Sequence, residues 1–279
     1  MNSIKKMMLS GALGCLISGM AYADGSSPQP VKPYWQDIQV VAVNKEKPRS
    51  SFMSYADRET ALTSRFEKSP YYSLLNGTWK FFFVDSYKDL PQNITDPSVN
   101  TSSWDDITVP GNWEVQGHGV AIYTNHGYEF KPKNPQPPLL PEANPVGVYR
   151  RDIEIPANWD NRDIYLHIGG AKSGLYVYLN GKEVGYSEDS KNPAEFLINK
   201  YLQPGKNVLT LKIFRWSTGS YLECQDFWRM SGIERDVFLW SQPKASIQDF
   251  RVVSTLDDTY TNGIFKLAVD LKNHTQETK

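Results

Sequence analysis

Short runs of apolar and β-branched residues, bounded by glycine, proline, asparagine and aspartate, constrain the fold of this chain most strongly. The clearest example is found at residues 175–187, where two such runs flank Asn180-Gly181. An Asn-Gly pair supplies the positive φ angles that a type I′ turn requires. We therefore predict a β-hairpin with strands at 175–179 and 183–187.

Similar runs predict further strands through the central part of the chain, at 78–85, 147–155, 163–168, 207–214 and 237–240. Residues 34–72 show no regular pattern except a short helical turn predicted at 55–61. Short, closely spaced strands without helical periodicity are typical of a two-sheet sandwich. The sequence therefore predicts an all-β fold.

Residues 112–144 differ from the rest of the chain because they are rich in proline and glycine. Proline removes a backbone donor, so regular strands within a sheet are not expected here. The segment also carries several aromatic residues. A long loop with its own aromatic residues is typical of a functional segment or of one packed against a partner.

The composition excludes some classes of partner. The chain has 279 residues, and 30 Lys and Arg against 31 Asp and Glu leave a formal net charge of −1. This balance provides no electrostatic attraction to nucleic acid or to an anionic membrane. The aromatic content of 13% favours strands and surfaces of the kind that bind sugars.

The first 23 residues have the pattern of a secretory signal peptide. Two lysines at positions 5 and 6 precede an apolar stretch at 7–20, and Ala-Tyr-Ala at 21–23 forms a cleavage signal. We expect the mature chain to begin at Asp24 and to be secreted or periplasmic. The alternatives are an uncleaved membrane anchor and a lipoprotein processed at Cys15.

Cleavage would leave Cys224 as the single cysteine, which excludes an internal disulfide. A catalytic thiol needs a neighbouring base, and no histidine stands in an obvious nucleophile–base setting. A passive, partly buried cysteine is the favoured interpretation. The sequence contains no Cys and His cluster at zinc spacing.

Residues 214–237 combine two Trp, a Tyr and two Phe with several charged residues. Flat apolar faces beside carboxylate and guanidinium groups suit a sugar, whose C–H faces pack on aromatic rings while its hydroxyls bind charged groups. The alternative is a buried loop whose charges pair with one another.

The same segment reads R-W-S-x-G-S-Y-L-E-x-Q-D-x-W-R-M-S-G-I and resembles a loop of the β-galactosidases of glycoside hydrolase family 2. Further segments resemble motifs of that family in the family's order, at 74–81, 109–114, 122–125, 144–150, 185–190 and 194–196. The resemblance extends from about residue 35 to about residue 255.

The resemblance implies a domain layout. Residues 24–72 would form a linker and an irregular segment, and residues 73–243 a jelly-roll, galactose-binding-like β-sandwich that binds sugar. Alternating patterns predict strands at 245–255 and 263–271, and the resemblance makes residues 244–279 the start of a truncated immunoglobulin-like sandwich. A catalytic (β/α)8 barrel would lie outside this chain.

Retaining glycoside hydrolysis requires two carboxyl groups about 5 Å apart. The candidate pairs are Glu188 with Asp189, Glu223 with Asp226, and Glu234 with Asp236. Adjacent residues of a strand point to opposite faces, which disfavours the first pair. Glu223 and Asp226 are the best pair, and the alternative is that they form structural ion pairs with Arg215, Arg229 or Arg235, or serve binding alone.

The resemblance implies that no catalytic residue lies in this chain, since the family's catalytic glutamates, sugar-binding histidines and Mg²⁺ ligands belong to the barrel. It carries over two substrate-binding residues, Asn125 and Asp226, with Asp226 also helping to hold Na⁺. The alternatives are a turn residue before Gly127 for Asn125, and a salt bridge to Arg229 for Asp226. Two positions depart from the family pattern, Thr218 and Cys224.

The function that the resemblance implies is hydrolysis of terminal β-D-galactosides by a retaining double displacement, performed by a complete enzyme that is a homo-oligomer. We expect a galactoside as partner, and neither nucleic acid nor, after signal cleavage, a membrane. The alternatives are a non-catalytic carbohydrate-binding module or inactive remnant, and an interaction domain of a larger assembly. Within the family, β-glucuronidase or β-mannosidase specificity is the other possibility.

Overall fold

The computed structural model describes residues 32–130 and 134–275. The predicted signal peptide, with Cys15 and the expected cleavage site before Asp24, lies outside the described residues. Among the described residues, no helix has both the length and the apolar character needed to cross a bilayer.

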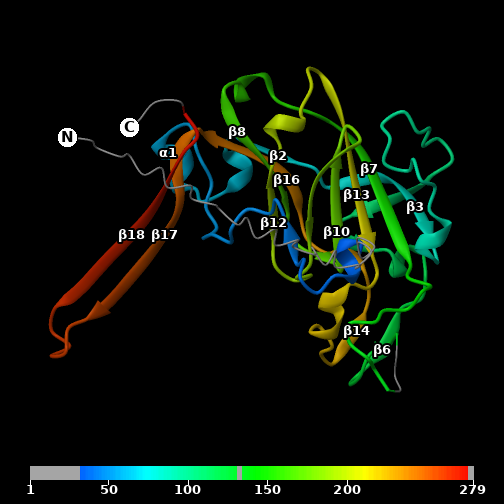
Figure 1. Ribbon diagram of the computed structural model, residues 1–279. Coiled ribbons are helices and arrows are strands. Elements are labelled where there is room, and N and C mark those ends of the chain that lie inside the picture. Colours follow the sequence, from blue (N-terminus) through cyan, green and yellow to red (C-terminus); the bar gives the residue numbers. More distant parts are fainter. Residues whose placement is uncertain (1–31, 131–133, 276–279) are drawn as a thin grey trace, which may run out of the picture. The chain divides into compact units, whose positions relative to one another are not determined.

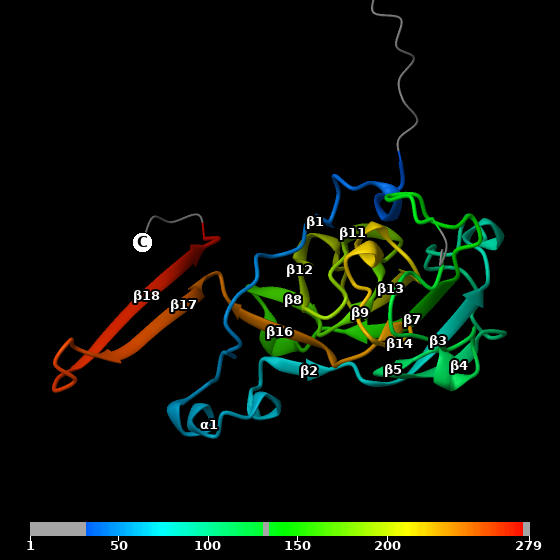
Figure 2. The same ribbon diagram turned by 90° about the horizontal axis from the view of Figure 1, so that it is seen from below.

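The larger of two main sheets is antiparallel and has seven strands (Figures 1 and 2). Their order across the sheet is β1 (Ala42–Val43), β11 (Lys182–Ser187), β10 (Gly174–Leu179), β13 (Lys206–Phe214), β7 (Val146–Glu154), β3 (Gly77–Val84) and β4 (Asp105–Val109).

The second main sheet is antiparallel with four strands, in the order β12 (Ala194–Leu197), β8 (Arg162–Ile168), β16 (Val237–Pro243) and β2 (Tyr72–Leu74). Side chains of both sheets share one core, to which β3 contributes Phe81, β8 contributes Leu166 and β16 contributes Leu239. Burial of each such side chain stabilises the fold by about 1.5–3 kcal/mol. The predicted all-β sandwich is confirmed.

The long strands lie within a residue or two of their predicted positions, with one exception. The predicted Asn-Gly turn joins β10 to β11 with positive φ at Asn180 (52°) and Gly181 (77°). The exception is the strand predicted at 237–240, which continues to Pro243 because β16 pairs along its whole length with β8. The predicted helical turn is α1 (Arg58–Leu62), whose first turn is capped by the Asp57 carboxylate.

Two small sheets were not predicted. One joins β5 (Gly111–Asn112), β15 (Gly232–Ile233) and β9 (Ala171–Lys172), and the other joins β6 (Ile122–Thr124) to β14 (Phe227–Arg229). Residues 112–144 were expected to hold no regular strand in the interior of a sheet, and the strand found there, β6, has three residues and pairs only with β14.

The remaining elements are short 3-10 helices and a hairpin. The 3-10 helices are η1 (Tyr34–Gln36), η2 (Phe66–Lys68), η3 (Tyr87–Asp89), η4 (Glu114–Gln116), η5 (Ala157–Trp159), η6 (Asn199–Tyr201) and η7 (Thr218–Tyr221). The hairpin consists of β17 (Ala245–Leu256) and β18 (Gly263–Asn273), which pair only with each other. Both strands were predicted, and their membership of an immunoglobulin-like domain stays a prediction.

Candidate functional site

Asn125 and Asp226 adjoin the two paired strands of a short ribbon, β6 and β14 (Figure 1). The last residue pair of the ribbon is Thr124 with Phe227. Asn125 comes directly after Thr124 and Asp226 directly before Phe227, so both residues lie at the same end of the ribbon. Their neighbourhood depends on the pairing of segments about a hundred residues apart.

One face of this ribbon is exposed and carries a mixed aromatic and polar surface. Tyr123 and Trp228 are a directly opposed pair of the ribbon, and the exposed residues Asn125 and Asp226 lie in the bends just beyond the two strands, at the same end. Tyr123 and Trp228 are 55% and 53% exposed, and their ring centroids lie 5.7 Å apart. We call these four residues the ribbon face.

Within the ribbon face, the Tyr123 hydroxyl donates a hydrogen bond of 2.8 Å to Oδ1 of Asp226. This bond raises the pKa of Tyr123, because it favours the neutral phenol. Nδ1 of His126 lies 2.7 Å from Oδ1 of Asn125, and the Asn125 amide nitrogen is a further donor. The face thus presents ring surfaces, a carboxylate and an amide, a set that suits a hydroxyl-rich ligand.

The opposite side of the ribbon is anchored by Arg229, which is buried. Its guanidinium donates to the Glu223 carbonyl at 3.1 Å, and its Nε lies 3.4 Å from the Glu129 carboxylate. Glu129 also accepts a 2.8 Å hydrogen bond from the Trp216 indole. Within the described residues Arg229 pairs with Glu129 rather than Asp226, so the alternative ion pair is not formed.

A second buried arginine supports the loop that leads into β6. Nη1 of Arg215 lies 3.6 Å from Glu114, and Nη2 donates to the Val120 carbonyl at 3.0 Å. Burial raises the pKa of Glu114, against the effects of a hydrogen bond from the Ser231 amide and of the nearby Arg215. Buried arginine side chains thus support both the ribbon and the loop that leads into β6.

The carboxyl groups considered for catalysis have separate partners. Glu223 accepts two hydrogen bonds from Ser190, at 2.8 Å from its amide and 2.6 Å from its hydroxyl. Asp226 accepts from Tyr123. Glu234 binds Lys191, so none of these contacts assembles the acid and nucleophile pair of a retaining glycosidase.

Residues 72–243 match the family model described as the sugar binding domain of glycosyl hydrolases family 2. The chain belongs to this family. The match ends at the residue where β16 ends.

The family 2 chain is similar to curated relatives named β-galactosidase. It is 40% identical to that of Priestia megaterium over 87% of this chain and 24% of the relative. It is 37% identical to that of Psychromonas ingrahamii over 87% of this chain and 23% of the relative. The chain thus spans about a quarter of the length of these relatives.

Solved structures resemble the fold. A β-glucuronidase of an uncultured Clostridium species matches with a TM-score of 0.53 and 23% identity, over 72% of this chain and 33% of that one. A β-glycosidase from Bacteroides vulgatus matches with a TM-score of 0.55 and 22% identity, over 74% and 25%. At these identities the likeness concerns the fold alone.

The two departures from the family motifs have structural roles. Thr218 donates to the Glu188 carboxylate at 3.0 Å, and so helps to fix η7. The Cys224 thiol lies 3.1 Å from the Ser220 carbonyl, and burial raises its pKa. A raised pKa disfavours the reactive thiolate, in agreement with the passive interpretation.

The donors for a cation are limited. In the parts of the chain that the structure describes, no three His, Cys, Asp or Glu side chains are placed to share a metal ion. The ribbon face does contribute oxygen atoms from Asp226, Tyr123 and Asn125, and oxygen is the ligand type that hard cations take. These residues fit a share in an alkali-ion site that other ligands would complete.

Sequence reasoning missed the aromatic half of the ribbon face. Tyr123 and Trp228 lie within the recognised motifs, but neither was assigned a role. The signal was present in the alternation Tyr123, Asn125 and Asp226, Trp228, which places each aromatic residue two positions from a proposed ligand.

Proposed function

We propose that this chain is the sugar-binding part of a glycoside hydrolase that acts on terminal β-D-galactosides with retention. The observation that carries the proposal is the ribbon face, where Tyr123 and Trp228 stand beside Asn125 and Asp226 on exposed backbone. The names of the curated relatives support galactose as the sugar.

In this proposal, Asn125 and Asp226 bind hydroxyl groups of the galactoside, and Tyr123 and Trp228 pack against its C–H face. Asp226 also contributes one ligand to Na⁺. The acid and nucleophile, and the ligands of Mg²⁺, belong to a barrel that residues outside this chain supply. The complete enzyme is a homo-oligomer, with residues 73–243 as the sugar-binding domain and residues 244–279 as part of an immunoglobulin-like one.

We further propose that the protein is exported by a signal peptide at residues 1–23. The basic, apolar and small-residue pattern of this segment supports the proposal. Sequencing the amino terminus of the exported protein would identify the cleavage site, which we expect before Asp24.

The test uses the purified chain with a β-galactoside and a β-glucuronide. We expect methyl β-D-galactoside to change the tryptophan fluorescence of the chain, because Trp228 is exposed on the ribbon face. Asp226→Asn and Asn125→Ala should each weaken binding roughly tenfold, the loss of about 1.4 kcal/mol. Asp106→Asn is the matched control, since Asp106 is an exposed aspartate of β4.

We also expect the chain alone not to hydrolyse a chromogenic β-galactoside. Turnover that survives the combined change of Glu223→Gln and Asp226→Asn would contradict this expectation. Binding without turnover in the full-length protein would favour the non-catalytic module instead. Tighter binding of the glucuronide would replace galactose as the proposed sugar.

A further inference from the structure

A cavity lies beside the four-stranded sheet and is lined by none of the residues of the ribbon face. Its volume is about 370 Å³, at the lower end of the range for small-molecule sites. β8 contributes His167, β12 contributes Glu195 and β16 contributes Phe238. The segment before α1 contributes Lys45, Arg49, Phe52 and Met53, and η2 contributes Phe66.

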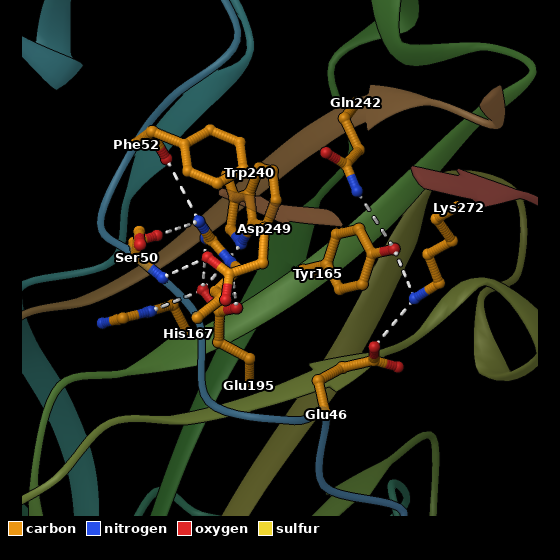
Figure 3. A network of polar contacts seen from close by, with 11 residues as sticks. Glu46, Ser50, Phe52, Tyr165, His167, Glu195, Trp240, Gln242, Asp249 and Lys272 are labelled. Atoms are coloured by element: carbon orange, nitrogen blue, oxygen red, sulfur yellow. Dashed lines mark hydrogen bonds and ion pairs between the residues drawn. The ribbon is translucent and has the colours of Figure 1, made fainter. Parts of the chain in front are cut away.

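The His167 ring in this cavity is held from two sides. Its Nδ1 lies 2.8 Å from the Glu195 carboxylate, and its plane stacks on Phe238 with ring centroids 4.2 Å apart. Glu195 also accepts from Arg49 at 2.9 Å and from the Trp240 indole at 3.1 Å. Figure 3 shows Glu195 at the centre of this network.

The contacts of Glu195 decide which ring nitrogen of His167 carries a proton. Burial works against the charge of Glu195, but hydrogen bonds from His167 and Arg49 outweigh it and lower the carboxyl pKa. An ionised carboxylate only accepts hydrogen bonds, so Nδ1 of His167 must be the donor.

The second nitrogen of His167, Nε2, points away from the network in Figure 3. Within the described residues it has no hydrogen-bond partner. Nε2 carries a lone pair when the ring is neutral and an N–H when the ring is charged. A hydroxyl group can meet either form, because it both donates and accepts. The fixed ring can therefore bind a hydroxyl group of a ligand through Nε2.

The rest of the cavity favours a neutral ligand with an apolar face. Three cationic side chains are balanced by three anionic ones, and Arg49–Glu195 is an internal pair. Phe66, Phe52 and Met53 provide apolar wall. Burial lowers the pKa of Lys45, and its ammonium has no hydrogen bond or ion pair within the described residues.

We propose that this cavity binds a neutral pyranose, as a mono- or disaccharide, with Nε2 of His167 on a ring hydroxyl and the sugar's C–H face against Phe66. The proposal rests on the sugar-binding role proposed above and adds a second subsite to it. The site would hold saccharide on the body of the sandwich, independent of the ribbon face.

The histidines of the chain allow both sites to be observed in one experiment. His126 adjoins Asn125 of the ribbon face, whereas His167 lines the cavity. We would label the four histidines of the purified chain with ¹³C, assign His167 with His167→Gln, and titrate with lactose. We expect the His167 signal to shift and saturate, with its own midpoint.

Two variants separate the sites. Asp226→Asn should weaken the response of His126 and leave that of His167 unchanged. Phe66→Ala should weaken the His167 response about fivefold, the effect of a lost aromatic contact. Phe265→Ala, an exposed aromatic of β18, is the control and should change neither response.

The proposal is overturned if the His167 signal stays fixed while the chain is folded, or if Phe66→Ala leaves its midpoint unchanged. Loss of both responses in Asp226→Asn would also overturn it, because a single site would then explain both. A response at His167 with none at His126 would support the cavity and count against the ribbon face.

Discussion

Glu188 is a buried carboxylate behind the loop that carries the candidate site. It accepts hydrogen bonds from the Tyr186 hydroxyl at 2.7 Å and from the Gly219 amide at 2.6 Å. Burial raises the pKa of Glu188, and these hydrogen bonds oppose the rise without cancelling it. The folded chain therefore binds this proton more tightly than the unfolded chain does.

This raised pKa has a testable consequence for stability. Its stabilising effect is fully present below the pKa of the unfolded state, about 4.3, and is lost as the pH rises through the higher folded value. We expect the unfolding free energy of the wild type to fall over that window relative to that of Glu188→Gln. Urea unfolding at several pH values measures this change in unfolding free energy. Glu59→Gln is the control, because Glu59 is exposed. Parallel pH profiles for wild type and Glu188→Gln would contradict the prediction.

The β17–β18 hairpin has an exposed apolar face among its described residues. Phe265, Leu267 and Leu271 of β18 are 67%, 54% and 78% exposed. Apolar side chains gathered on an unpaired two-stranded element favour association with other chains.

We therefore expect the purified chain to associate as its concentration rises. Phe265→Lys combined with Leu271→Lys should shift it toward monomer, because lysine on this face opposes stacking of hairpins. Light scattering coupled to size-exclusion chromatography measures the mass. Leu62→Lys is the control, since Leu62 is equally exposed on α1. A wild-type chain that stays monomeric at all concentrations would show the prediction to be wrong.

The elements that the sequence predicts are those whose pattern is local. β7 and β13 have nine residues each and contain several β-branched, aromatic and other apolar residues, so their own sequences predict them as strands. β6 has three residues in a proline-rich segment, and it forms because β14 pairs with it. Such a strand carries no pattern of its own, and its existence depends on a partner far along the chain.

In the candidate site too, single residues could be predicted from the sequence, but their arrangement depends on pairing between distant segments. Asn125 and Asp226 were named from the family resemblance, and their adjacency comes from β6–β14 pairing that neither segment specifies alone. The buried network around Glu195 was not predicted at all, because Arg49, His167 and Trp240 meet it only through the packing of four separate segments.

At the scale of the whole molecule, residues 46–50, which precede α1, form polar contacts with the β17–β18 hairpin. The Ser50 amide donates to the Asp249 carboxylate of β17 at 2.9 Å, and its hydroxyl donates to the Phe250 carbonyl at 2.9 Å. Lys272 of β18 contacts both Glu46 and Tyr165, at 2.8 Å and 3.2 Å (Figure 3). Three parts of the chain that are distant in sequence thus share one set of polar contacts.

We expect Glu46→Gln combined with Asp249→Asn to loosen the hairpin without unfolding the sandwich. The sandwich keeps its own core of buried side chains from both sheets, whereas the hairpin strands pair only with each other, and these contacts are among those that attach the hairpin. Hydrogen exchange followed by mass spectrometry should show roughly tenfold faster exchange in β17 and β18, and unchanged exchange in β7 and β13. Asp270→Asn is the control for the loss of a negative charge from the hairpin, because Asp270 is an exposed residue of β18. Equal acceleration in the sandwich strands would mean that hairpin and sandwich unfold as one unit, and that the contacts of residues 46–50 are not what attaches the hairpin.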